Sequence, residues 1–372
     1  MKKRIVLVFA LAVLLFSLVS TVWAEEEAAG DFTYVLLPDG TAEITAYLGK
    51  EDVCVIPETV DGYTVTGLAG NIKLFRQEYN HVYDVVITVG PHVLEIPATV
   101  TYIGMLDEEA LDAFLGAEGN VLTTWKGEWR VAEDNPVYRS IDGVLFDRTG
   151  RTLIQYPADR EEENYAVPEG TEEIGCGAFC YNNSLKGLTL PETLKRIGDY
   201  AFAGCAEMAD LTIPQRVDFI GWLAFPCVTG NRGGVQLRQI LVSPYNSVYY
   251  DVDGVLFSRT DRKLICYPAG RQETSYDVPE GTQILGPYAF NRNQALNILC
   301  IPEGVTVIEE MALGAMPNRD GLRIMLPESL TQIDIHQFYK DYAGRCKFVV
   351  YPGGGAEAYC LEHHWLFEYA DE

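Results

Sequence analysis

The sequence predicts a β-rich solenoid, a chain of short units that stack along one axis. Two repeats at different scales support this prediction. The shorter one is a phrase of proline, then isoleucine and glycine, then alanine and phenylalanine, and it recurs at a step of 23 residues through the middle of the chain. The phenylalanine of the phrase stands at Phe179, Phe202, Phe225 and Phe290. A fixed period of this length is typical of units that bury their apolar faces only against their neighbours.

The longer repeat is a shift of 111 residues. Residues 135–179 align without a gap on residues 246–290 and are identical to them at 27 of 45 positions. The duplicated block covers residues 135–202 and 246–313, so several units were copied together. Selection for a single catalytic site rarely leaves two such copies, and the duplication therefore favours a repetitive scaffold.

Each unit begins with a short strand that ends at the proline. Leu188 and Leu190 show the pattern, because they flank one outward residue, as a half-buried strand requires. Proline ends the strand since it has no N–H for the β-ladder. We expect the isoleucine and the alanine–phenylalanine pair to return to the core from a second side of the coil. A small polar residue three positions after the phenylalanine (Asn182, Cys205 or Asn293) can satisfy backbone groups of the turn.

These residues resemble a known family. The pattern Leu-x-Ile-Pro, Ile-Gly and Ala-Phe-x-x-Cys-x-x-Leu is similar to the BspA-type leucine-rich repeats of bacterial surface antigens, from about Val53 to Pro352. The resemblance implies a leucine-rich-repeat solenoid with a parallel sheet on one side, short irregular or helical turns on the other, and β-hairpin insertions. We expect roughly ten or eleven strands in one continuous sheet. The resemblance also implies an exported or surface-exposed binding protein, adhesive in some members, and it transfers no catalytic residue.

The repeats are interrupted in two ways. Residues 69–83 and 101–119 keep little of the phrase, so this N-terminal part is expected to be irregular or enlarged. Residues 138–156 indicate three short strands with a tight turn at Asp142-Gly143, and the second copy repeats this turn at Asp253-Gly254. These hairpins could serve as spacers inside the solenoid or as a binding element.

The sequence divides into four segments. A basic start followed by an apolar run predicts a secretory signal peptide over residues 1–24, cleaved after Ala24. Residues 25–52 are expected to form an N-terminal capping hairpin, residues 53–352 the solenoid, and residues 353–372 a C-terminal cap. Caps are needed because an open solenoid end exposes strand edges and core.

Charge and hydropathy restrict the partners and the compartment. The formal net charge is −25, which disfavours nucleic acid and anionic membrane surfaces as partners. No apolar run after the signal peptide is long enough to cross a bilayer, so we expect no membrane insertion after cleavage. The expected location is secreted or extracellular, with non-covalent association to the cell surface as a further option.

The sequence offers little for catalysis, and we expect no enzyme, no cofactor and no metal site. It has no Gly-x-Ser-x-Gly motif, phosphate loop or zinc-protease helix. The five histidines are His81, His92, His336, His363 and His364. None of them stands at a metal-binding spacing. The nine cysteines are expected to be mostly buried free thiols, with Cys176 and Cys180 as the one pair near enough in sequence to form a disulfide.

The predicted function is that of an exported, non-catalytic interaction protein that binds a protein or glycan partner through its repeat surface, as an adhesin does. The alternative is an enzyme with a site on the irregular N-terminal coil or on the hairpins. Outward strand positions become more apolar toward the C-terminus, and such patches mark interaction sites. The candidate binding residues are Gln239, Leu241, Ile298, Cys300, Arg323 and Met325. A cap or a neighbouring loop that folds over them would explain their apolar character equally well.

Overall fold

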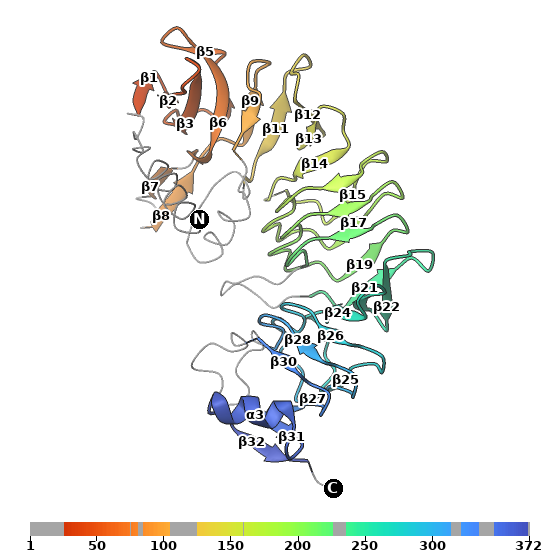
Figure 1. Ribbon diagram of the computed structural model, residues 1–372. Coiled ribbons are helices and arrows are strands. Elements are labelled where there is room, and N and C mark those ends of the chain that lie inside the picture. Colours follow the sequence, from red (N-terminus) through yellow and green to blue (C-terminus); the bar gives the residue numbers. More distant parts are fainter. Residues whose placement is uncertain are drawn as a thin grey trace, which may run out of the picture.

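The chain forms a curved stack of β-coils, seen as an arc in Figure 1. The structure is a computed structural model that describes residues 26–74, 76–80, 85–104, 125–158, 160–225, 236–313, 321–334 and 346–370. The predicted signal peptide lies outside the described residues. The regular coils each contribute one longer strand and one two-residue strand, which lie on two sides of a shared core.

The longer strands form three parallel sheets on one side of the stack, with three, four and five strands. The first sheet contains β4 (Val53–Val55), β9 (Val93–Ile96) and β11 (Glu128–Val131). The second contains β15 (Asn164–Ala166), β17 (Gly187–Thr189), β19 (Asp210–Ile213) and β21 (Gln239–Val242). The third contains β25 (Ser275–Asp277), β27 (Ile298–Cys300), β29 (Arg323–Met325), β31 (Lys347–Val350) and β32 (Phe367–Tyr369). In Figure 1, β15, β17 and β19 follow one another down the right-hand side of the arc.

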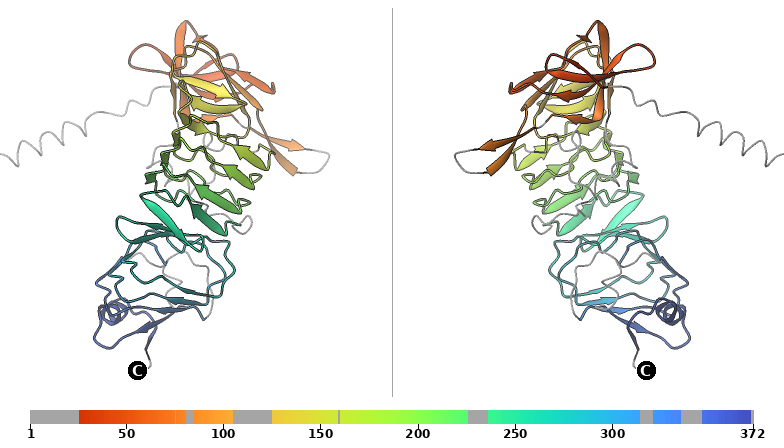
Figure 2. Two further views of the ribbon diagram at one scale, coloured as in Figure 1. Left: turned by 90° about the vertical axis from the view of Figure 1, so that its right-hand side faces the viewer. Right: turned by 90° about the vertical axis from the view of Figure 1, so that its left-hand side faces the viewer.

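The two-residue strands form parallel ladders on a second side. The first ladder contains β16 (Glu173–Ile174), β18 (Arg196–Ile197) and β20 (Phe219–Ile220). The second contains β26 (Ile284–Leu285), β28 (Val307–Ile308) and β30 (Gln332–Ile333). The register repeats from coil to coil, with isoleucine or leucine always facing its counterpart. Figure 2 shows these coils from the two sides as one column.

Two inserted hairpins separate the three longer-strand sheets. They consist of β12 (Tyr138–Ile141), β13 (Val144–Asp147) and β14 (Thr152–Gln155), and of β22 (Tyr249–Val252), β23 (Val255–Ser258) and β24 (Lys263–Cys266). At the first tip, Asp142 and Gly143 have φ angles of 49° and 75°, the left-handed pair of a type I′ turn. Gly143 O accepts a hydrogen bond from Trp129 N at 3.0 Å, so the hairpin tip takes the place of the next strand. The fold class is confirmed, but the strands expected in one continuous sheet are distributed over three.

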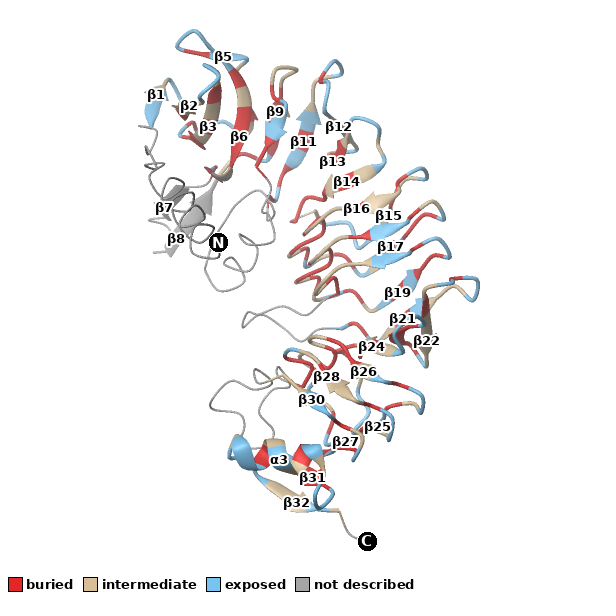
Figure 3. Ribbon diagram, viewed as in Figure 1, coloured by how far each residue is buried: buried red, intermediate tan, exposed pale blue. Residues whose placement is uncertain are grey.

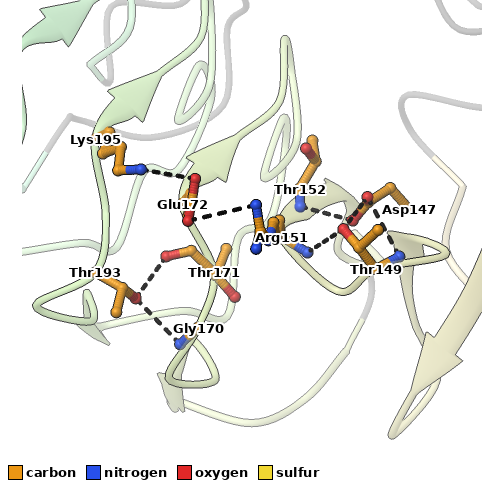
Figure 4. A network of polar contacts seen from close by, with 9 residues as sticks. All are labelled: Asp147, Thr149, Arg151, Thr152, Gly170, Thr171, Glu172, Thr193 and Lys195. Carbon is orange, nitrogen blue, oxygen red and sulfur yellow. Dashed lines mark hydrogen bonds and ion pairs between the residues drawn. The ribbon is translucent and has the colours of Figure 1, made fainter.

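A polar ladder joins the first hairpin to the coils that follow it (Figure 4). Lys195 Nζ donates to Glu172 Oε2 at 2.9 Å, and Arg151 lies 3.9 Å from the other oxygen of this carboxylate. The hydrogen bond from Lys195 is the main cause that lowers the pKa of Glu172. Thr193 Oγ1 donates to Thr171 O at 2.8 Å in the same region. These contacts bind neighbouring coils to each other at the surface.

The repeated phenylalanines form a stacked core, as the phrase predicts. Phe179, Phe202 and Phe290 are fully buried, and the ring centroids of Phe179 and Phe202 lie 5.6 Å apart. Tyr156 of the first hairpin stacks on Phe179 at 5.0 Å, so the hairpin joins the same core. Figure 3 shows buried residues along the whole arc, as expected for a core that grows lengthwise.

The small polar residue after each phenylalanine has the role predicted for it. Asn182 and Asn293 each donate to a carbonyl of the preceding coil and accept two backbone N–H groups of their own turn. Cys205 Sγ donates to Phe179 O at 3.0 Å. Buried turns therefore keep their polar groups paired.

Antiparallel strands precede the N-terminal end of the stack. They are β1 (Glu27–Ala29), β2 (Phe32–Leu36) and β3 (Ala42–Tyr47), and β3 pairs in parallel with β6 (Tyr63–Lys73). The other strands of this region are β5 (Thr59–Val60), β7 (Arg76–Asn80), β8 (Val85–Val89) and β10 (Tyr102–Ile103). We propose that β2 and β3 cover the open end of the core.

At the C-terminal end, the helix α3 (Gly355–Glu362) precedes β32. Ala356 and Cys360 of this helix are buried in the last core cluster, and β32 extends the third sheet beside β31. We propose that this helix and strand form the C-terminal cover. No helix within the described ranges is long and apolar enough to span a bilayer.

Candidate binding surface

The outward face of the longer strands is available as a continuous surface within each sheet. Side chains alternate along these strands, and in β19 Leu211 and Ile213 are buried whereas Asp210 and Thr212 are exposed. The inward leucines and isoleucines fix the register, because a slip by one residue would turn them into solvent. Outward positions are free to vary, and they determine what the surface can bind.

Four of the six predicted binding residues lie together on β27 and β29. Ile298 pairs in register with Arg323, and Cys300 pairs with Met325. Ile298 is 41% exposed and Met325 is 39% exposed, although both are large apolar side chains. Cys300 Sγ lies 3.3 Å from Met325 Sδ, so the two sulfur-containing side chains touch. We call these four residues the C-terminal patch.

A charged border follows the C-terminal patch on β31 and β32. Glu368 accepts from both Lys347 and Arg323, and the hydrogen bond from Lys347 is the largest cause that lowers its pKa. Arg323 therefore points toward the end of the sheet, away from the apolar pair. The border leaves Ile298 and Met325 as the apolar part of the patch.

The C-terminal helix and strand do not cover the patch. The strand β32 lies beside β31 in the plane of the sheet, and α3 packs Ala356 and Cys360 against the end of the core. Ile298 and Met325 retain about two fifths of their exposure, and the core cluster of this end of the protein includes neither of them.

The other two predicted residues, Gln239 and Leu241, lie apart from the patch on β21. Leu241 is 40% exposed, but β21 is the last strand of the second sheet and the patch belongs to the third. The tip of the second hairpin intervenes, since Gly254 O accepts from Ile240 N at 2.8 Å. Gln239 lies against this tip, where a side chain at Gly254 would come within 2.5 Å of its Cβ. The structure therefore does not join the six residues into one surface.

The Cys300 thiol is not prepared for nucleophilic chemistry. Burial, together with the hydrogen bond and the charge of Asp277, raises its pKa to about 11. A thiol with such a pKa is protonated at neutral pH, whereas a reactive cysteine needs the thiolate. In this surface Cys300 serves as a small, polarisable contact residue.

Sequence reasoning missed a polar hollow on the second sheet. A cavity of about 450 Å³ lies over β15, β17 and β19, where Gly187 occupies an outward position without a side chain. Asn164, Thr189 and Asp210 surround it. A glycine at an outward strand position is the signal that could have identified the hollow, because its neighbours at equivalent positions carry side chains.

The histidines and cysteines of the described ranges give no metal centre. His92 forms an ion pair with Asp52, and His363 packs against Tyr359 of the C-terminal helix. Within these ranges no group of three or more histidine, cysteine or acidic residues is placed to hold a metal ion. His81, His336 and Cys227 lie outside the described residues. Among the described cysteines, Cys176 and Cys180 are not joined by a disulfide, and the free thiols include Cys54, Cys205, Cys266, Cys300, Cys346 and Cys360.

Comparison with known proteins identifies the repeats. Residues 159–232 and 269–347 match the family described as BspA type leucine-rich repeat region, with six copies of the repeat. The chain carries BspA-type leucine-rich repeats over these two ranges. Repeats of this family indicate a role in protein interaction. No curated protein matches the sequence.

Solved structures of leucine-rich-repeat proteins are similar to this chain along most of its length. A leucine-rich cell surface protein from Faecalibacterium prausnitzii is 20% identical, with 94% of this chain and 95% of that chain covered and a TM-score of 0.48. The pneumococcal vaccine antigen PcpA is 17% identical, with 94% and 99% covered and a TM-score of 0.47. A leucine-rich repeat protein from Bacteroides ovatus is 16% identical, with 93% and 100% covered and a TM-score of 0.38.

Proposed function

We propose that this protein is an exported, non-catalytic interaction protein that binds a protein or glycan partner through the outward face of its longer-strand sheets. The C-terminal patch is the observation that carries the proposal. Ile298 and Met325 stand on neighbouring strands with their apolar side chains in water, whereas the outward positions Thr189 and Thr212 of the second sheet are polar. Contiguous exposed apolar side chains mark protein contacts more often than isolated ones. This part of the surface favours a protein as the partner.

Export rests on the predicted signal peptide of residues 1–24, and it places the binding surface outside the cell. The net charge of −25 disfavours anionic partners and favours a neutral or basic one. The charged border beside the patch, with Arg323 and Lys347 both engaged by Glu368, would form the polar rim of such an interface.

The test is a pull-down with mature protein, residues 25–372, against extracellular-matrix and cell-wall fractions. Ile298→Lys combined with Met325→Glu places two charges in the patch. We expect this variant to lose the partners that the parent retains, with an unchanged melting temperature. The matched control is Thr189→Lys with Thr212→Glu, which places the same charges at outward positions of the second sheet and should bind as the parent does.

Two results would contradict the proposal. Equal retention of every partner by the parent and the patch variant would remove the patch from the interface. A large drop in melting temperature would mean that Ile298 and Met325 belong to a packed interior and not to a free surface.

A further inference from the structure

A cavity of about 550 Å³ lies at the junction between the two copies of the duplicated block. One wall is β20 with the turn that follows it, and it includes Phe219 and Trp222. The opposite wall is the second hairpin, with Tyr249 and Lys263, and Tyr288 of the next turn closes one end. The cavity is separate from the C-terminal patch and from the outward face of the longer strands.

The cavity exists because the hairpin coil is shorter than a regular coil. Regular coils place twelve residues between the two-residue strand and the next longer strand, as residues 198–209 and 286–297 do. In the coil of the second hairpin, Leu264 is the register partner of Leu285, and ten residues, 265–274, separate it from the next longer strand. Two residues are therefore missing from the turn side of the stack. The turns before and after the short coil face each other across a gap.

The same junction breaks the ladder of two-residue strands. The strand β20 is the last of its sheet, and the next ladder begins beyond the hairpin. Ile220 N donates to Tyr249 OH at 3.0 Å in place of a strand partner. The gap is thus bounded by a strand edge on one side and by aromatic side chains on the other.

Aromatic rings dominate the walls of the cavity. The rings of Trp222 and Tyr288, from turns on opposite sides of the junction, meet at 5.4 Å between centroids with an interplanar angle of 78°. Both side chains are half-buried and thus reach the surface of the cavity. At the rim, the guanidinium of Arg196 lies 4.0 Å from the centroid of the Phe219 ring. One wall of the site therefore already holds a cation against an aromatic face.

Carboxylates outnumber cations around the rings. Asp199 and Asp261 line the cavity, and Lys263 is the cation of the lining. Lys263 is engaged by Glu309 at 3.0 Å and lies 3.8 Å from Asp261, so its charge is already balanced. Among the lining residues, Asp199 and Asp261 against Lys263 leave an excess of one negative charge. The acidic chain as a whole adds to this field.

We propose that this junction cavity binds a small organic cation, a positively charged nitrogen on an apolar or aromatic body. The volume falls in the range of pockets that hold drug-sized ligands. The aromatic walls take the apolar body and interact with the cation through their ring faces, and Asp199 and Asp261 supply the compensating charge. The site is a product of the block duplication, because it lies where the short hairpin coil of the second copy follows the coil that connects the two copies.

The test compares three probes of nearly equal size by titration calorimetry with the mature protein. They are benzylammonium, benzyl alcohol and benzoate. We expect the cation to bind at least about tenfold more tightly than the alcohol, and benzoate not to bind. Its affinity should fall as salt is raised, because salt screens the carboxylates. Equal binding of the cation and the alcohol, or no binding of the cation, would overturn the proposal.

Substitutions then locate the site. Asp199→Asn and Asp261→Asn remove the charges and keep the size of each side chain. The amide oxygen introduced by Asp199→Asn can still accept from Trp222 N, as the carboxylate does. Each substitution should weaken the cation about threefold or more, and Asp210→Asn, on the outward face of β19, should leave the affinity unchanged. If Asp210→Asn weakens the cation as much as the two cavity variants do, the binding reflects net charge and the cavity is not the site. The probe comparison on the parent protein remains decisive if a cavity variant fails to fold.

Discussion

The two copies of the duplicated block share a backbone but fill their hairpins differently. Beneath the hairpin of the first copy, Trp129 of β11 is fully buried, and its indole N–H donates to Gln155 Oε1 at 2.6 Å. The positions 111 residues later hold Ile240 and Cys266. An aromatic–amide pair in one copy is thus replaced by an aliphatic side chain and a thiol in the other, and Cys266 lines the junction cavity.

The contacts that both copies share indicate which contacts the hairpin requires. Trp129 N and Ile240 N both donate to the carbonyl of a hairpin-tip glycine. Asn135 and Asn246 are both buried and make the same four hydrogen bonds, two as donors to the preceding coil and two as acceptors from their own strand. The turn and the buried asparagine therefore define the insertion, and the residues packed beneath it can change.

The two copies should differ most in the stability that they lose when the residue packed beneath the hairpin, Trp129 or Ile240, is truncated. Trp129→Ala opens a large cavity and deprives the buried Gln155 of its donor, so we expect a loss of about 3–5 kcal/mol in the free energy of unfolding. Ile240→Ala removes less volume and leaves no polar group unpaired, so its loss should be smaller. Urea unfolding followed by circular dichroism measures both.

A swap tests the cause of this difference. Trp129→Ile with Gln155→Cys installs the pair of the second copy in the first and should lose less stability than Trp129→Ile alone, because no buried amide is left unpaired. A double variant that loses as much as the sum of its single variants would show that the indole–amide hydrogen bond is not the reason.

Substitution of the buried asparagines should cause the next largest loss of stability, and the loss should be equal in the two copies. Asn135→Ala and Asn246→Ala each leave two backbone N–H groups and two carbonyls without their side-chain partner. We expect each to lower the free energy of unfolding by about 2–4 kcal/mol. A difference of more than about 1 kcal/mol between the two variants would contradict the structural equivalence of the copies.

The fold could be predicted from the sequence because its determinants are repeated. The phenylalanine stack, the small polar residue that follows it and the Asp-Gly hairpin tips each recur at a fixed spacing and have one physical role. The left-handed residue before each alanine could not be predicted, since it is glycine only at Gly177. Tyr200, Leu223, Tyr288 and Met311 adopt φ angles of 48° to 55° there. The N–H groups of Tyr200 and Tyr288 donate to the next coil, at 2.9 Å to Trp222 O and at 3.1 Å to Glu310 O, so these contacts depend on the stacked neighbour.

The binding surface was less accessible to sequence reasoning. Alternation identified outward residues correctly at Ile298 and Met325, because period two is local. The alternation could not show that a hairpin tip separates Leu241 from Ile298 and Met325, since this separation depends on which strand lies next to β21 in space. The junction cavity results from a coil that is two residues short, and the consequence of the missing residues appears only when two turns from different repeats are placed side by side. The binding role of the six residues stays a prediction.

Substitution of the hairpin-tip glycines should cause a smaller difference in stability between the two copies. Alanine in place of either tip glycine meets the strain of a left-handed φ, about 1–2 kcal/mol. At Gly143 the added Cβ would lie 3.1 Å from Glu128 Cγ, part of a flexible side chain, whereas at Gly254 it would lie 2.5 Å from Gln239 Cβ. Gly254→Ala should therefore lower the unfolding midpoint more than Gly143→Ala, as thermal denaturation can measure. Equal midpoints would mean that the two tips are not packed differently.

The smallest difference concerns an ion pair that both copies place beneath the hairpin tip. Arg160 Nε lies 2.8 Å from Glu162, and Arg271 contacts Glu273 through two nitrogens, at 2.8 and 3.3 Å. Both arginines also donate to the carbonyl of the tip aspartate. The second arginine is less exposed, 11% against 21% for its side chain. The pair of the second copy should therefore be the stronger of the two.

The pH dependence of this ion pair follows from the two glutamates. The hydrogen bond from Arg160 lowers the pKa of Glu162, and the pKa of Glu273 is lowered against the effect of burial by backbone hydrogen bonds and by Arg271. A carboxylate with a lowered pKa stabilises the fold above its ordinary value of 4.5, and this contribution is lost as the pH falls through the folded-state value. Glu162→Gln and Glu273→Gln should each lose less than about 1 kcal/mol at pH 7, as half-exposed pairs do, with the larger loss at Glu273. Unfolding midpoints measured at pH 7 and at steps below 4.5 should converge for parent and variants, because the protonated glutamates no longer form the pair. A difference that persists in acid would assign the effect to packing of the side chain and not to its charge.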